Sequence, residues 1–236
     1  MSDEQRFQRI AGMTTMLSLL PALASGICLA AAANFRLNAL SNPSTLITIG
    51  TDGALLFRWG MVLDVFGYYL LLTPLALWWW KWLKPNGSLL VMLYTWCGLA
   101  YILVGAMGAI LLAAVEPPLI IQYVQASSTQ RETLQIVFTS FLNAVYLGLW
   151  NPLEALLAGI WWVGVGSLLR RERRGLGIVS ILLGVGALLD AFGNFMGVEP
   201  IFLLGVSWLV LFFFVWVAWC GIELLWRPRH NHERRQ

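Results

Sequence analysis

The sequence predicts an all-α protein: a polytopic membrane bundle of six transmembrane helices with both termini in the cytoplasm. Hydrophobic residues make up 59% of the 236 residues and charged residues only 11%, whereas a soluble domain carries about 25% charged residues. The apolar residues gather in six runs, each containing the roughly 20 residues that cross a bilayer as a helix. Since these runs use nearly the whole chain, residues 1–236 are expected to form a single transmembrane domain.

The predicted spans follow one another with short polar connections. The first run is longer than the apolar core of a signal peptide, which has about 7–15 residues, and Asp3 and Glu4 spoil the positive start that such a peptide needs. We therefore expect an uncleaved first helix. In chain order the predicted spans are residues 11–34, 55–82, 88–115, 150–169, 176–197 and 200–226.

The end of the third span and the start of the fourth are not set by hydrophobic length alone. Glu116-Pro117-Pro118 is predicted to end the third helix. The next apolar run, residues 134–169, is too long for one simple span, but two spans would place the Arg cluster at 170–174 on the outer side. We therefore expect one span at 150–169 with an outer extension at 134–149, which protrudes or lies along the membrane surface. Pro152 then lies in the first turn of the span or kinks a continuous helix.

Positive charge falls on alternate connections. With six spans, 12 of the 15 Lys and Arg residues lie on one side, and Arg36, Arg58 and Arg131 lie on the other. Because cytoplasmic connections carry the excess of Lys and Arg, both termini are expected in the cytoplasm of a cell membrane, taken to be a bacterial inner membrane. The expected partners are the lipid bilayer and anionic headgroups, and the basic clusters need no nucleic acid. The 12 residues are Arg6, Arg9, Lys81, Lys84, Arg170, Arg171, Arg173, Arg174, Arg227, Arg229, Arg234 and Arg235.

Aromatic and acidic residues mark the predicted cytoplasmic ends of two helices. Four Trp residues surround Lys81, and an interfacial belt explains them better than an aromatic ligand box does, because Trp prefers the interface. A tight turn is predicted at residues 84–87. Glu223, close to Arg227, is expected to form a surface ion pair. The four Trp residues are Trp78, Trp79, Trp80 and Trp82.

The motifs of cofactor binding and catalysis are missing from the sequence. His230 and His232 lie in the polar tail, so no apolar run carries a His that could ligate haem. The three Cys residues are far apart and lack metal-ligand spacing. No phosphate-cradling Gly loop, zinc signature or nucleophile elbow occurs. We therefore expect no cofactor, no metal and no catalytic residue, which argues against an enzyme.

Three acidic residues inside the apolar runs are the candidate functional groups, because a charge within the membrane is costly. Asp64 lies 17 residues from Lys81, Glu154 lies 16 from Arg170, and Asp190 lies 16 from Arg174. At about 1.5 Å per residue, each lies about 24–26 Å from the inner edge. All three are thus predicted to share one layer in the outer third of a hydrocarbon core about 30 Å thick.

Further polar residues extend this candidate ligand-binding site. Asn151 shares a helix face with Glu154, and Asn194 shares one with Asp190. Arg58, six residues before Asp64, lies near the outer edge. The alternative is that these acids cap helices, make interhelix hydrogen bonds or reach water and headgroups at the interface.

The order of features resembles a bacterial family of small six-helix integral membrane proteins that is catalogued only as a domain of unknown function. The resemblance rests on three stretches: Arg9-Ile10-Ala11-Gly12, the segment 57–64 (FRWGMVLD), and the basic turn followed by 175–178 (GLGI) and then Leu189-Asp190. Members often carry Pro in that turn, where this chain has Arg173-Arg174-Gly175. The family implies six helices and supplies no activity or functional residue.

The leading hypothesis is a small transporter or sensor that binds a cation, a proton or an amphipathic small molecule in an outward-facing polar pocket. Protonation of the acids would be the natural switch. The alternative is a non-catalytic accessory or assembly subunit that docks a membrane-protein partner or a second copy of itself. A membrane-embedded lipid-modifying enzyme is the third hypothesis, since two carboxylates can do acid–base work.

Overall fold

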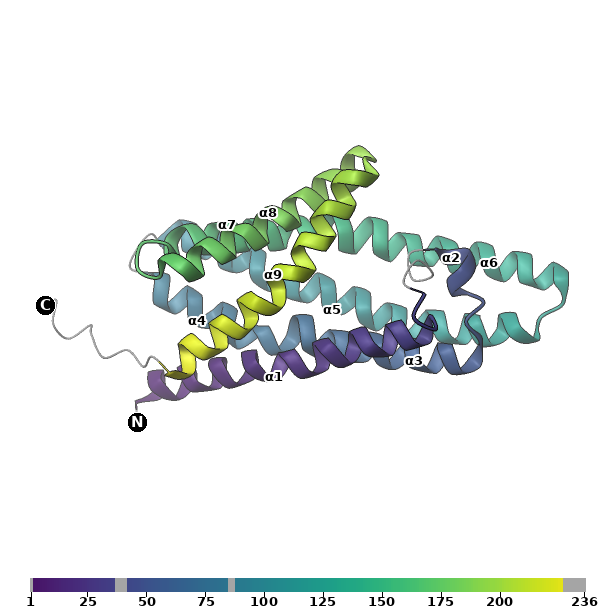
Figure 1. Ribbon diagram of the computed structural model, residues 1–236, viewed down its shortest axis with the longest axis horizontal. Helices are drawn as coiled ribbons and strands as arrows, with labels where there is room; N and C mark the ends of the chain where they lie inside the picture. The colour runs from purple at the N-terminus through teal and green to yellow at the C-terminus, as the bar shows by residue number, and fades with distance from the viewer. Residues whose placement is uncertain (1, 37–41, 85–87, 227–236) are drawn as a thin grey trace, which may run out of the picture.

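The computed structural model describes residues 2–36, 42–84 and 88–226, and within these ranges the regular elements are helices and none is a strand (Figure 1). This described part contains six helical stretches that are long and apolar enough to cross a membrane. The predicted all-α bundle of six membrane-length helices is confirmed. The stretches are Asp3–Ala32, Gly50–Leu83, Leu89–Gln125, Ser128–Leu169, Arg174–Met196 and Glu199–Trp226.

The first and last helices bring the two ends of the described chain together. Helix α1 (Asp3–Ala32) starts with a capping box in which Ser2 and Gln5 exchange hydrogen bonds. It begins at the end of the bundle where α9 (Glu199–Trp226) ends (Figure 1). There the Gln8 side-chain amide donates to the Leu224 carbonyl at 2.9 Å. An even number of crossings produces this arrangement, and the cytoplasmic location of that end stays a prediction.

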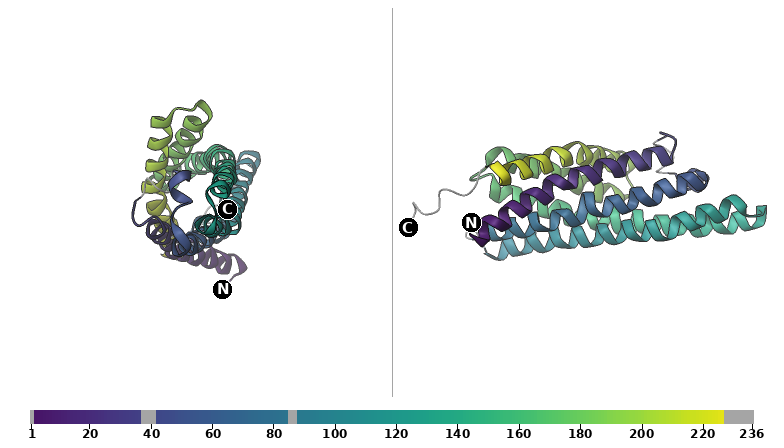
Figure 2. Two further views of the ribbon diagram at one scale, coloured as in Figure 1. Left: turned by 90° about the vertical axis from the view of Figure 1, so that its right-hand side faces the viewer. Right: turned by 90° about the horizontal axis from the view of Figure 1, so that it is seen from below.

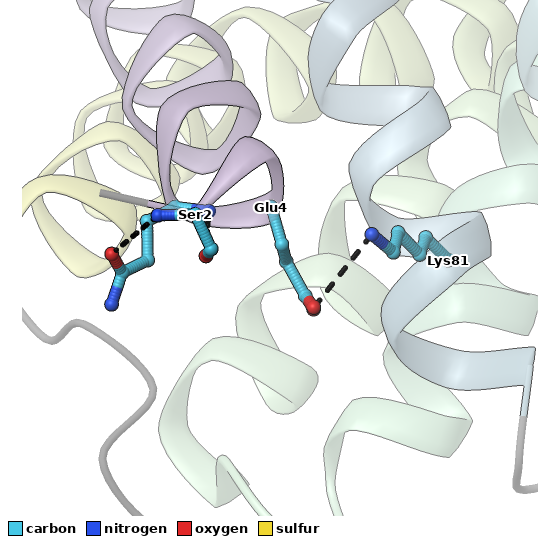
Figure 3. Close-up of polar contacts among 4 residues, drawn as sticks. Ser2, Glu4 and Lys81 are labelled. Carbon is cyan, nitrogen blue, oxygen red and sulfur yellow. Dashed lines mark hydrogen bonds and ion pairs between the residues drawn. The ribbon is translucent and has the colours of Figure 1, made fainter.

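The second crossing is a chain of four helical segments with different periods. Helix α3 (Gly50–Asp64) runs into a π-helical segment, η2 (Val65–Tyr69), then a 3₁₀ segment, η3 (Leu70–Leu72), and then α4 (Thr73–Leu83). Pro74 explains part of this change, because it has no N–H for the carbonyl four residues earlier, and that break in the α-helical ladder falls at the 3₁₀ segment. Lys81 near the end of α4 lies 3.7 Å from Glu4 of α1, which places both at the same end (Figure 3).

The predicted aromatic belt at the end of α4 is only partly right. Trp80 is 39% exposed, as a belt residue should be, but Trp78 and Trp79 are 3% and 1% exposed. These two indoles belong to the protein core together with Trp161 and Trp216. Their direction follows from the helical period: three successive Trp residues cannot all face the same surface of one helix.

Helix α5 (Ser88–Gln125) continues past the predicted stop at Glu116-Pro117-Pro118, so the prediction that the helix ends there is wrong. A proline removes a backbone donor but keeps the φ angle of a helix. Beyond the prolines, Ile120 is fully buried in a cluster with Phe138 and Leu142. This packing holds the distal part of α5 in helical form despite the missing hydrogen bonds.

The fourth run is one continuous helical stretch with a π-helical middle. Helix α6 (Ser128–Asn143) leads into η5 (Ala144–Glu154), a π-helical segment of 11 residues, and then into α7 (Ala155–Leu169). Pro152 lies inside η5, so the alternative of a continuous helix is the correct one. The hairpin of α5 and α6 extends beyond α1 and α3 at the end opposite to the start of α1 (Figure 1).

The last three helices form two further hairpins. Helix α8 (Arg174–Met196) packs closely on α7, because a Cβ at Gly184 would lie 2.7 Å from the Val163 backbone nitrogen. It ends at Gly197 in a left-handed conformation (φ 66°), which suits Gly. The tip of the α8–α9 hairpin lies apart from the tip of the α5–α6 hairpin (Figure 2, left).

A short helix, α2 (Pro43–Leu46), lies in the connection between α1 and α3 and buries Leu46. Of the turn predicted at residues 84–87, only Lys84 lies within the described residues, and the basic tail that is predicted to be cytoplasmic lies outside them. That tail contains Arg227, Arg229, His230, His232, Arg234 and Arg235.

Candidate functional site: carboxylates within the membrane helices

Asp64 lies at the junction between α3 and the π-helical segment η2. A π-helical segment changes the direction of the side chains that follow it, and such segments are frequent at functional sites. The Asp64 carboxylate, which is half-buried, accepts a long hydrogen bond of 3.5 Å from the Ser25 hydroxyl of α1. Ser25 itself is only 1% exposed. The carboxylate thus faces an interhelix contact rather than lipid alone.

Glu154 is the last residue of the second π-helical segment, η5. Its two carboxylate oxygens accept from one hydroxyl, that of Tyr69, at 3.1 and 3.2 Å. Tyr69 is the last residue of η2 and is only 5% exposed. The two π-helical segments therefore meet through this buried tyrosine, and the second and fourth crossings are joined by a polar contact inside the bundle.

Asp190 of α8 is only 5% exposed. The Asn194 side-chain amide donates to the Asp190 carboxylate at 2.9 Å and to the Asp190 carbonyl at 3.0 Å. Asn194 and Asp190 thus share a helix face, as the spacing predicts. The contact orients the Asp190 carboxylate within the bundle.

Glu154 is the central member of the three predicted acids. It lies on η5, which packs against α8, the helix that carries Asp190, and its hydroxyl partner Tyr69 ends η2, the segment that follows Asp64. The three acids thus lie on elements that pack against one another, each from a different crossing. Like charges in a water-poor site repel one another, so the group favours occupation by a proton or a cation.

Aromatic residues surround the Tyr69–Glu154 contact. The Tyr101 ring of α5 lies 5.5 Å from the Tyr69 ring, and its hydroxyl donates to the Tyr68 carbonyl at 2.9 Å. Trp150 of η5 donates from Nε1 to the Gly105 carbonyl at 3.2 Å. A side chain at Gly105 would overlap the Tyr69 ring. This glycine therefore allows the tyrosine to reach Glu154.

Two of the predicted site residues are not joined to the acids. Arg58 is exposed and Asn151 is half-buried. Among the hydrogen bonds and ion pairs of the described residues, none links either side chain to Asp64, Glu154 or Asp190. The carboxylate group is thus best described by the three acids with Ser25, Tyr69 and Asn194 as their hydrogen-bond donors.

A fourth acid, Glu116 of α5, was missed because it was interpreted as part of a helix end. It is fully buried, and neither carboxylate oxygen has a hydrogen-bond partner among the described residues. The helical period could have found it, since Glu116 follows the buried residues Ala109 and Leu112 at intervals of seven and four.

The donor set indicates what kind of ion the acids suit. Within the described ranges, no group of three or more His, Cys, Asp and Glu side chains lies close enough to hold a metal ion. A tyrosine hydroxyl, a serine hydroxyl and an amide already donate to the carboxylates. This geometry suits proton exchange between a few oxygen atoms better than the multidentate shell of a metal ion.

Six membrane-length helices and a group of acids inside them indicate a multi-pass membrane protein. Comparisons of the chain with protein-family models, with curated proteins and with solved structures give no match. The resemblance to a six-helix family of unknown function therefore stays a prediction from the three sequence stretches. The function is therefore inferred from the residues of this chain alone.

Proposed function

We propose that this membrane protein is a small transporter or sensor that binds a proton at the carboxylates of Glu154, Asp64 and Asp190. One observation carries the proposal: Glu154, placed at the end of a π-helical segment, accepts hydrogen bonds from the buried Tyr69 hydroxyl inside the bundle. Ionisable residues inside membrane helices are costly, and they typically mark ion pathways or proton relays.

A proton is the occupant that the arrangement favours. It needs no cavity, and it converts one of several repelling carboxylates into a neutral group that still forms hydrogen bonds. Tyr69 can donate to an ionised Glu154, and it can accept from a protonated one. The contact therefore persists in both states, while the charge of the group changes by one.

The proposed access is from the end of the bundle that carries the α5–α6 hairpin. Glu116 lies in the distal half of α5, between Ala113 and Ile120, which belong to one apolar cluster with Val145 and Tyr146 of η5. Glu154 is the last residue of η5. The proposed route for a proton from the hairpin end therefore passes Glu116 and η5 before it reaches Glu154.

The test measures protonation and movement separately. In lipid nanodiscs, infrared difference spectra between two pH values are expected to show the carbonyl band of a protonated carboxylic acid, and Glu154→Gln is expected to remove it. In vesicles that contain a trapped pH-sensitive dye, Asp64→Asn and Asp190→Asn are expected to abolish pH-dependent proton movement if the protein is a transporter. A sensor would show the infrared band without proton movement.

The matched control is Glu199→Gln, since Glu199 is an exposed acid at the start of α9. This variant is expected to behave like the wild-type protein. Unchanged infrared bands in Glu154→Gln, together with unchanged behaviour of Asp64→Asn, Asp190→Asn and their double variant, would refute the proposed function.

A further inference from the structure

A second polar site lies at the end of the bundle where α1 begins and α9 ends. It is a partly open cavity of about 40 Å³, enough for a few waters. Its walls come from α1, α4, α9 and the connection between α7 and α8. The lining includes Gln8, Trp78, Trp79, Trp82, Arg173 and Glu223. None of these residues belongs to the carboxylate group described above.

This cavity already binds a cation, and that cation is part of the chain. The Arg173 guanidinium pairs with the Glu223 carboxylate. Its central carbon also lies 5.6 Å from the centroid of the Trp82 ring, a cation–π contact. The prediction of a surface ion pair for Glu223 is therefore wrong: Glu223 does form an ion pair, but its side chain is only 10% exposed. Three tryptophans line the cavity in which the Glu223 carboxylate lies.

The tryptophans that line the cavity belong to a helix, whereas the Arg173 side chain comes from the connection between α7 and α8. Trp78 and Trp79 are buried on α4, and the Trp79 and Trp82 rings lie 5.1 Å apart. Gln8 is held by its hydrogen bond to Leu224. Arg173, by contrast, belongs to the connection at 170–173, and its side chain is 27% exposed. Among the residues that line the cavity it is the one that can leave without the movement of a helix.

We propose that Trp78, Trp79, Trp82 and Glu223 form a binding site for a small organic cation of the alkylammonium or quaternary ammonium class, and that Arg173 occupies this site when the ligand is absent. Indole faces and a shielded carboxylate are the groups that recognise such cations. An ammonium ligand would replace the guanidinium of Arg173 on the same partners. This inference is independent of the proposed proton site.

The charge balance favours a cation over an anion. Glu223 is the more shielded member of the pair, with a side chain 10% exposed against 27% for Arg173. An anion, such as a phosphate group, would have to approach this carboxylate and compete with it for Arg173. A weakly hydrated organic cation loses little hydration energy among three indoles, and it gains the carboxylate when Arg173 withdraws.

Choline is the probe for the test, with its neutral carbon analogue 3,3-dimethylbutan-1-ol as the ligand control. Binding is measured by calorimetry on the full chain in nanodiscs of phosphatidylglycerol, which has no ammonium group. The wild-type protein is expected to bind choline and not the analogue. Arg173→Ala is expected to bind choline about tenfold more tightly, because the site is no longer occupied by an internal competitor.

Matched variants distinguish the loss of the ammonium-binding site from general effects on folding. Trp82→Ala is expected to weaken choline binding about tenfold, whereas Trp80→Ala, which removes an exposed indole two residues away, is expected to leave it unchanged. Arg173→Lys retains a cation beside Glu223 and is expected to bind choline like the wild-type protein. This variant and Trp82→Ala keep the test decisive even if Arg173→Ala does not fold.

The source of the ammonium group is distinguished by a second set of nanodiscs. If phosphatidylcholine headgroups occupy the ammonium-binding site, nanodiscs made of this lipid are expected to suppress the binding of free choline. If the ligand is a free metabolite, the lipid is expected to have no effect on choline binding. The proposal is overturned if choline binds neither the wild-type protein nor Arg173→Ala, or if Trp82→Ala binds choline as the wild-type protein does. Binding of inorganic phosphate that is lost in Arg173→Ala would overturn it in favour of an anion site.

Discussion

The Tyr69 hydroxyl lies 3.1 and 3.2 Å from the two carboxylate oxygens of Glu154, although the two residues are 85 positions apart in the sequence. Each is the last residue of a π-helical segment, so the side chains that meet are the ones whose directions the π-helical turns have changed. This contact joins the second and fourth crossings of the bundle. It also gives the proposed proton site a hydrogen-bond partner that stays in place when Glu154 changes its charge.

Removal of this donor has a defined effect. Tyr69→Phe leaves the half-buried Glu154 carboxylate without its hydroxyl partner, which is expected to reduce the free energy of unfolding by about 1–3 kcal/mol. The infrared band assigned to Glu154 is expected to shift as well. The control is Tyr94→Phe, whose hydroxyl makes no hydrogen bond within the described part of the chain. Equal thermal unfolding of the two variants, with unchanged infrared bands, would show that the Tyr69 contact has no role.

A substitution at Gly105 of α5 tests the same contact between Tyr69 and Glu154. A Cβ at this position would overlap the Tyr69 ring, so Gly105→Ala is expected to displace the tyrosine and to cost about 1–3 kcal/mol in folding free energy. Gly26→Ala in α1 is the matched control, because no atom lies within 4 Å of its added Cβ. The control is expected to be neutral or stabilising by about 0.5–1 kcal/mol. Thermal unfolding in detergent compares the two, and a stable Gly105→Ala with wild-type protonation would contradict the geometry.

The Glu4–Lys81 and Arg173–Glu223 ion pairs differ in burial and should differ in energy. Glu4 and Lys81 are 38% and 51% exposed, and Lys81→Ala is expected to change the free energy of unfolding by less than about 1 kcal/mol. Glu223→Ala removes the shielded carboxylate, while Arg173 can turn toward solvent, so this variant is expected to cost about 1.5–3 kcal/mol. Denaturant titrations of both variants in detergent give the comparison. A larger loss for Lys81→Ala than for Glu223→Ala would contradict this ranking.

The predicted orientation can be measured with introduced cysteines. Thr129 is exposed beside the α5–α6 connection, and Ser2 is exposed before α1 at the opposite end of the bundle. A membrane-impermeant maleimide added to intact cells is expected to label Thr129→Cys, in a background with the three native Cys residues replaced, and not Ser2→Cys. Labelling of Ser2→Cys alone would place both termini outside and would reverse the charge-based prediction.

The number of crossings could be predicted from the sequence because hydrophobic length is read directly from the residues. Each of the six predicted spans lies on its own membrane-length helical stretch, although several of these stretches extend beyond the predicted bounds, and the even number of stretches brings Gln8 and Leu224 into contact. The depth argument, which converts sequence distance into depth by the rise per residue, placed Asp64, Glu154 and Asp190 in one layer. That common layer stays a prediction, while the hydrogen bonds of each acid to a neighbouring side chain come from the structure.

Features that depend on side-chain direction could not be predicted in this way. The π-helical segments rotate Tyr69 and Glu154 toward each other, and only the backbone hydrogen-bond pattern shows this. The buried state of Glu116 depends on the continuation of α5 through two prolines, against the usual meaning of that motif. Trp79 was predicted to face the interface from composition, whereas its rotation about α4 places it in the core.

The α5–α6 hairpin has a practical consequence. With 38 residues, α5 is about 57 Å long at about 1.5 Å per residue, almost twice the thickness of a hydrocarbon core of about 30 Å. Two continuous helices therefore carry the connection near Ala126 well away from the bilayer. A rigid helical protein that replaces this connection would move with the bundle, and it would give a 26.4 kDa membrane protein the additional mass and shape that electron microscopy needs to align its images.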